Sequence, residues 1–215
     1  MAEQKNETDP RLANELTFYS IIDAILKEHL EVGNTWVSRG GYMTFDTSLS
    51  FPYLTTLPVD LKALTTKIVK FLNTNKDELQ SALAGENDGY VQLKESFDLE
   101  GITVQGFQLF NREDVNLDMS VQISSADILN GLPRGLAYIG LLQLALAKWG
   151  DLATAGLILN MGNAYIYNDT TDRAKALLSA EISLPPEVFM KKIDIKKAVK
   201  SDDFFINEGW YGDIY

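Results

Sequence analysis

The sequence predicts an α+β fold in one domain, organised around a single long buried helix. Residues 133–149 form the longest and most apolar of the expected helices, as is typical of a core helix. Short apolar or alternating segments bounded by turn residues predict strands among the helices. No repeat, low-complexity tract or linker divides the 215 residues. A chain of this length buries roughly 70% of the surface that its unfolded form exposes.

The N-terminal part is predicted to form two amphipathic helices separated by a loop and a strand. Residues 1–12 are polar, and we expect a flexible tail followed by one domain over residues 13–215. Apolar residues recur at helical spacing between residues 11 and 31, and again between residues 59 and 72. Residues 35–47 alternate weakly and are rich in Gly and Thr, which favours a loop and a strand.

The rest of the chain is predicted to alternate between strands and helices around the core helix. Residues 84–90 form a turn-rich acidic loop. The later elements are a hairpin at 107–109 and 117–123, the core helix at 133–149, a buried strand at 157–167, a short helix at 173–179, and two short strands at 189–195 and 204–206.

Composition excludes several kinds of chemistry. The net charge of −11 argues against a nonspecific nucleic-acid binder, which needs a basic face. The sequence has no cysteine, so disulfides, thiolate metal sites and thiol nucleophiles are excluded. His29 is the single histidine, which makes His-based metal sites and catalytic triads a poor fit, and we expect no metal site.

No targeting or membrane segment is evident. Residues 1–10 are polar and charged, unlike a secretory signal. The apolar segment at 135–147 is too short to span a bilayer. We therefore expect a cytoplasmic protein without membrane contact.

Five segments, in the same order, resemble the thymidylate synthase family. Together they cover about residues 15–211. They are the first helix with Gly33 and Arg39-Gly40-Gly41, the stretch FPYLTT at 51–56 with IVKFL at 68–72, SSADILNGLP at 124–133 running into the core helix, GNAYIYND at 162–169, and DDFFINEGW at 202–210.

The resemblance implies the architecture of that family. We expect a large mixed β-sheet with helices on one face and a long buried core helix. In the family, the other sheet face packs against a second subunit, which implies a homodimer here or pairing with a catalytic homologue. The chain is shorter than family members, and the expected deletions fall after Arg39 and between Leu83 and Gly101.

The positions that carry the family's chemistry are changed in this sequence. The family attacks C6 of a pyrimidine deoxynucleotide with a cysteine thiolate and then transfers a one-carbon unit from a folate. Its Cys-His pair falls on Thr103 and Val104, and an unactivated hydroxyl is a poor nucleophile. Its cross-subunit arginine pair has no counterpart. At several other matched positions this sequence has a different residue from the family. It has Lys67 where the family has the general-base glutamate, Lys70 in place of a tryptophan, Ser124 in place of a phosphate-binding arginine, Gly135 in place of the base-reading asparagine, and Tyr165 in place of a histidine.

Five residues are candidates for nucleotide binding, and none is assigned a catalytic role. By the resemblance, Arg39 and Ser125 match phosphate ligands, Asp127 lies near the folate and Tyr167 bonds the sugar hydroxyl. Lys67 could add positive charge if it points inward. Each has a structural alternative: a surface arginine, a helix cap formed by Ser125 and Asp127, a buried tyrosine, and a lysine on a solvated helix face. We expect no cofactor, with folate binding left open.

Three hypotheses for function follow. The first is a divergent, non-catalytic family member without methyl-transfer activity, which binds a pyrimidine deoxynucleotide or acts as a regulatory or structural component of pyrimidine deoxynucleotide metabolism. Its compact form suggests a viral origin, because viruses often carry relatives that modify pyrimidine C5. The second is an enzyme with a non-cysteine mechanism that uses Lys67, Asp127, Tyr165 and Tyr167, which requires Lys67 and the tyrosines to converge on one pocket. The third is a non-catalytic subunit of a synthase or hydroxymethylase complex.

Overall fold

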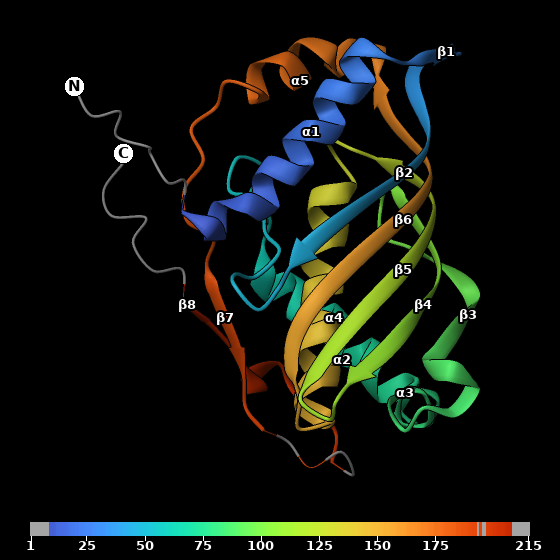
Figure 1. The fold of residues 1–215 in the computed structure, drawn as a ribbon, viewed down its shortest axis with the longest axis vertical. Helices are drawn as coiled ribbons and strands as arrows, with labels where there is room; N and C mark the ends of the chain where they lie inside the picture. Colours follow the sequence, from blue (N-terminus) through green and yellow to red (C-terminus); the bar gives the residue numbers. More distant parts are fainter. Residues whose placement is uncertain (1–8, 193, 195–196, 208–215) are drawn as a thin grey trace.

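The computed structural model describes residues 9–192, 194 and 197–207 and confirms the predicted α+β class (Figure 1). The helices are α1 (Ala13–Lys27), α2 (Leu61–Thr74), α3 (Lys76–Leu83), α4 (Leu132–Trp149) and α5 (Thr171–Leu177). The strands are β1 (Leu30–Val32), β2 (Thr35–Asp46), β3 (Tyr90–Asp98), β4 (Ile102–Arg112), β5 (Asn116–Asp127), β6 (Ala153–Tyr167), β7 (Glu187–Met190) and β8 (Phe204–Asn207). Short 3-10 turns lie at Pro10–Leu12, Glu86–Gly89, Asn168–Thr170 and Ser201–Asp203.

Six strands form one mixed sheet in the order β1-β2-β6-β5-β4-β3. The central pair β5 and β6 is parallel, and every other neighbouring pair is antiparallel. Strands β7 and β8 form a separate antiparallel pair. The mixed sheet predicted from the sequence is therefore confirmed.

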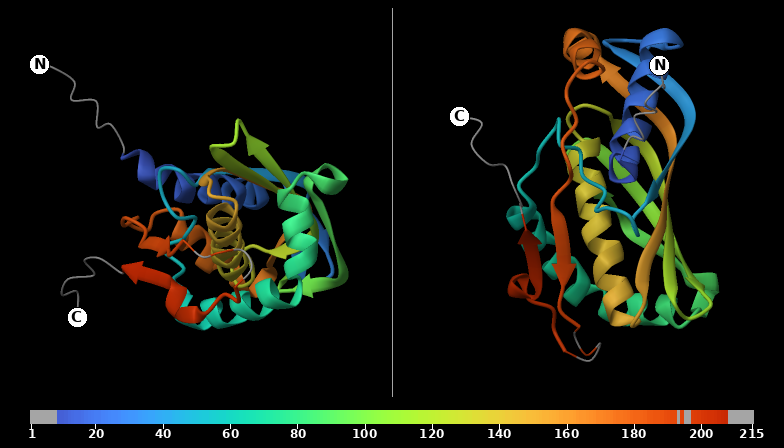
Figure 2. Two further views of the ribbon diagram at one scale, coloured as in Figure 1. Left: turned by 90° about the horizontal axis from the view of Figure 1, so that it is seen from below. Right: turned by 60° about the vertical axis from the view of Figure 1, so that its left-hand side comes forward.

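The helices lie on one face of the large sheet. In the right-hand view of Figure 2, α1 and α4 lie on the same side of the sheet, with α2 and the β7–β8 pair beyond α4. The buried apolar residues of these layers form one cluster. The opposite face of the central strands carries no helix among the described residues, so it remains open. This open face holds the candidate site.

Three elements were not predicted from the sequence. Helix α3 presents only Leu79 and Ala82 to the core, so its apolar pattern is short. Strand β1 has all three residues exposed and shows no alternation. Strand β3 lies where a deletion was expected, and its pairing with β4 is interrupted by a register shift. Part of the predicted N-terminal tail, Pro10–Leu12, forms a 3-10 turn, and its residues 1–8 lie outside the described residues.

Helix α4 is surrounded by protein on nearly all sides, with 15 of its 18 residues buried. Two glycines allow its neighbours to approach closely. A Cβ atom on Gly135 would lie 2.0 Å from Cδ1 of Ile102, and one on Gly140 would lie 2.5 Å from Cγ of Pro52. The side chain of Ile102 therefore occupies the space that a side chain at position 135 would need.

We predict that Gly135→Ala destabilises the protein by about 1–3 kcal/mol, because the added methyl group overpacks the contact between α4 and β4. Chemical denaturation measures the change. Gly41→Ala is the matched control, since its Cβ would meet only Cε of Met161 at an ordinary 3.7 Å. Equal stability of the two variants would contradict the close packing of Ile102 on α4.

Candidate functional site

A polar row crosses four strands of the sheet at one level. Arg39 on β2 pairs with Asn163 on β6, Asn163 pairs with Ser125 on β5, and Ser125 pairs with Thr103 on β4. Directly paired residues place their side chains on the same face of a sheet. The fold thus brings together two predicted phosphate ligands, Arg39 and Ser125, and adds Asn163.

The neighbouring row shows which face the polar row occupies. Ile102 pairs with Ala126, and Ala126 pairs with Ala164. Ile102 packs on Gly135 of α4, so this row points toward the helices. Side chains alternate along a strand. The residues of the polar row, such as Thr103, are adjacent in sequence to those of the inward-pointing row, so they point to the opposite face, which is open. Arg39 is exposed there.

The backbone is irregular beside the polar row. Gly40 has a φ of 68°, in the left-handed region, and the register between β4 and β5 shifts directly after Thr103. A Cβ on Gly162 would lie 2.8 Å from the carbonyl oxygen of Ser124, so β5 and β6 approach closely there. Such irregularities turn polar residues that follow one another in sequence toward one face.

Two tyrosines lie on the open face, after Asn163 on the same strand. Tyr165 and Tyr167 follow at alternate positions on β6, and their rings meet edge to face with centroids 5.5 Å apart. Tyr167 is exposed at the surface. An aromatic pair beside an amide and a guanidinium provides a stacking surface next to an anion-binding group.

Asp127 has a structural role in this arrangement. It is only 5% exposed, and its Oδ1 accepts hydrogen bonds from the backbone N–H groups of Leu129 and Asn130, each at 3.1 Å. Its Oδ2 accepts a third from Nδ2 of Asn130 at 2.9 Å. The carboxylate therefore shapes the turn that leads from β5 into α4.

Lys67 lies apart from the polar row. It is exposed on α2, and its Nζ lies 3.6 Å from Oε1 of Glu100. Arg134 also forms an ion pair with Glu100. Helix α2 packs against α4 on the helical side of the sheet, whereas Tyr165 and Tyr167 belong to the open side. Lys67 and the two tyrosines do not converge.

The single histidine and one buried phenol have structural surroundings. His29 stacks on Trp36 with ring centroids 3.9 Å apart, and its Nδ1 lies 3.1 Å from the carbonyl oxygen of Ile25. Burial raises the pKa of the phenol of Tyr138, which lies on α4 on the helical side of the sheet. No group of three or more potential metal ligands occurs within the described part of the chain.

The loop between β2 and α2, which contains the stretch FPYLTT, is held by a buried carboxylate from α1. Oε2 of Glu15 accepts hydrogen bonds from the backbone N–H and hydroxyl of Thr55, at 3.0 and 2.8 Å. Oε1 accepts the same two groups of Thr56, at 3.0 and 2.5 Å. Glu15 was not predicted as a functional or structural key residue, because its partners are 40 and 41 residues away in the sequence.

Asn163 was not among the predicted site residues, although it lies within the segment GNAYIYND that carries the resemblance. Its alternation with Tyr165 and Tyr167 was the available signal, because residues at i, i+2 and i+4 of a strand share a face. Its pairing with Arg39 and Ser125 depends on sheet order, which the sequence alone does not provide.

Comparison with known proteins identifies the family. The thymidylate synthase family model matches residues 96–210, which is more than half of the chain. The chain belongs to the thymidylate synthase family. The match spans Thr103, Ser125, Asp127 and Tyr167, whereas Arg39 lies before it. No curated protein matches the sequence. None of the described helices has the length and apolar character needed to cross a membrane.

We predict that Asp127→Ala lowers the free energy of unfolding by about 0.5–2 kcal/mol, because backbone donors of the turn before α4 lose their acceptor. Urea denaturation measures the loss. Asp169→Ala, at an exposed position beyond β6, serves as the control. An unchanged stability of Asp127→Ala would return this carboxylate to the candidates for ligand contact.

Proposed function

We propose that this chain is a non-catalytic member of the thymidylate synthase family that binds a phosphorylated pyrimidine deoxynucleotide on its open sheet face. In this role it is a regulatory or structural component of pyrimidine deoxynucleotide metabolism. The observation that carries the proposal is the row formed by Arg39, Asn163 and Ser125 in register across three strands.

The residues of this row suit a phosphate group. The guanidinium of Arg39 can donate two parallel hydrogen bonds to phosphate oxygens, and the hydroxyl of Ser125 and the amide of Asn163 can donate further ones. Tyr167 and Tyr165 offer an aromatic surface to the sugar and base. The strongly negative chain thus presents a local cation beside neutral donors, which favours a small anion over a nucleic acid.

The absence of suitable nucleophiles supports a non-catalytic role. The sequence contains no cysteine, the residue whose thiolate serves as nucleophile in the family. His29 is engaged in stacking with Trp36. An enzyme that uses Lys67 with the two tyrosines is disfavoured, because these side chains lie on different sides of the sheet.

The open face also supports association with a second subunit. Tyr42 on β2 is 71% exposed and Ile158 on β6 is 37% exposed, and both lie among short polar residues such as Thr44 and Asn160. Interfaces commonly combine aromatic anchors with polar residues. A second copy of this chain placed here would cover the polar row and exclude water from it. A catalytic homologue that takes the same position is the alternative partner.

We predict that dUMP or dCMP raises the melting temperature of the wild-type protein and that Arg39→Ala removes the shift. At a hundredfold excess over Kd, a ligand that binds only the native state adds about 2.7 kcal/mol of stability. Thermal unfolding with each nucleotide measures the effect. Arg112→Ala removes an exposed arginine on β4 that pairs with Asp118, and serves as the control.

Two results would count against the proposed function. The first is a thermal shift in Arg39→Ala equal to that of the wild type, which would place the nucleotide elsewhere. The second is the formation of methylated nucleotide when the wild-type protein is incubated with dUMP and a methylene folate, since the proposal expects none.

We predict that Tyr42→Glu converts a dimer into a monomer, because a buried unpaired carboxylate at an interface is strongly unfavourable. Light scattering coupled to size-exclusion chromatography measures the mass. Leu16→Glu, an exposed position on α1 away from the open face, is the control. A wild-type monomer at high concentration would argue against self-association and for a different partner.

A further inference from the structure

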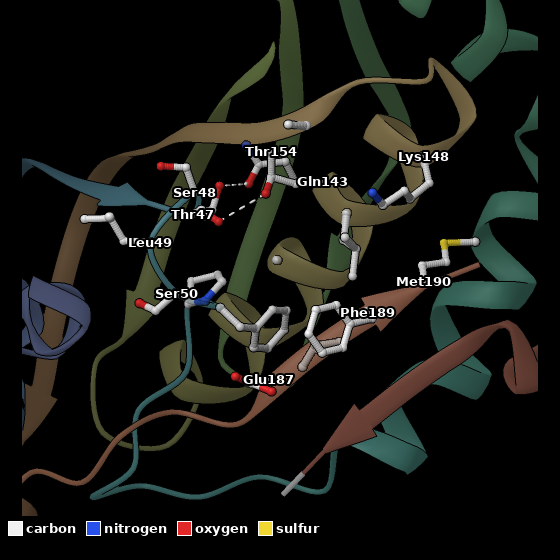
Figure 3. A pocket seen from close by; sticks show the side chains of 16 residues that line it. Thr47, Ser48, Leu49, Ser50, Gln143, Lys148, Thr154, Glu187, Phe189 and Met190 are labelled. Carbon is white, nitrogen blue, oxygen red and sulfur yellow. Dashed lines mark hydrogen bonds between the residues drawn. The ribbon is translucent and has the colours of Figure 1, made fainter. Parts of the chain in front are cut away.

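A cavity lies on the helical side of the sheet, far from the polar row. It has a volume of about 430 Å³ and is bounded by the loop after β2, one face of α4, the start of β6 and strand β7 (Figure 3). Thr154 on its wall and Asn163 in the row are nine residues apart on β6, which corresponds to roughly 30 Å along a strand. A cavity of this size is in the range that accommodates small organic ligands.

Most polar groups on the wall of this cavity are engaged within the protein. The hydroxyl of Thr47 donates to the carbonyl oxygen of Ala155 at 2.6 Å and lies 3.0 Å from Oε1 of Gln143. The hydroxyl of Thr154 donates to the carbonyl oxygen of Thr47 at 3.1 Å. Nε2 of Gln143 donates to two backbone carbonyl groups, each at 3.0 Å. These residues fix the wall and offer few free donors to a ligand.

Lys148 differs from its neighbours on this wall. It is half-buried near the end of α4, and Figure 3 shows its ammonium directed toward the interior of the cavity. No hydrogen bond or ion pair to Lys148 occurs among the described residues. The nearby carboxylate of Asp151 is instead paired with Lys192 at 2.5 Å. A half-buried ammonium with open donor positions favours an anionic group as its partner.

The rest of the cavity provides an apolar surface. Phe189 on β7 is 56% exposed and Leu49 on the loop is 47% exposed, and Leu144 and Met190 also line the cavity. Burying such side chains under an apolar ligand is favourable. We therefore propose that this cavity binds a small monocarboxylate with an apolar body, whose carboxylate contacts Lys148.

Glu187 limits the charge of this ligand. It begins β7 and lies on the other side of the cavity from Lys148 (Figure 3). A second carboxylate at the far end of the ligand would face this like charge, which is unfavourable. The site consequently selects a monocarboxylate over a dicarboxylate of the same length.

Calorimetric titration with octanoate, octanamide and octanedioate tests the proposal. The wild-type protein should bind octanoate about ten- to a hundredfold more tightly than the neutral amide, because a hydrogen bond to a charged group contributes that much to affinity. Lys148→Met should reduce octanoate affinity to that of octanamide and leave octanamide binding unchanged. Lys62→Met, an exposed lysine on α2, should have no effect.

A separate variant, Glu187→Gln, tests whether the cavity prefers a monocarboxylate to a dicarboxylate. Octanedioate should bind more weakly than octanoate to the wild type, and Glu187→Gln should narrow this difference while it leaves octanoate bound. Leu144→Trp, which fills the cavity, should abolish binding of octanoate and octanamide alike, with folding confirmed by circular dichroism. Absence of octanoate binding to the wild type, or equal octanoate affinity of the wild type and Lys148→Met, would overturn the proposal.

Discussion

The close contact between Ile102 and Gly135 is the constraint on which the site region depends. It brings α4 directly against β4 and so sets which sheet face is covered and which is open. With Ile102 pointing inward, Thr103 and its register partners must point outward. The same contact leaves no room for a side chain at position 135.

The main architecture could be predicted from the sequence because its signals are local. The long apolar stretch of α4, the helical periodicity of α1 and α2, and the alternation in β5 and β6 each lie within one segment. Short or exposed elements such as β1 and α3 gave too few apolar positions to be recognised. The arrangement of one large sheet with helices on one face was predicted from the resemblance to the thymidylate synthase family.

The candidate site was only partly predictable. Arg39, Ser125 and Tyr167 were selected by resemblance, and the structure places them on one face. Asn163 was missed because its neighbours come from strands distant in sequence. Asp127 accepts hydrogen bonds in the turn before α4, and Lys67 pairs with Glu100, so each has a structural contact that resemblance alone does not reveal. Lys148 carried no signal, because its setting depends on β7, which is remote in sequence.

The centre of the sheet is encoded by one continuous stretch of chain. Strand β5, helix α4 and strand β6 follow one another directly between residues 116 and 167, and the two strands pair in parallel (Figure 1). The outer strand β3 pairs on one side only and comes from a separate segment. Loss of β3 would therefore remove pairing from one edge of the sheet and leave the β5–α4–β6 segment intact, so this edge can tolerate changes in length that the centre cannot.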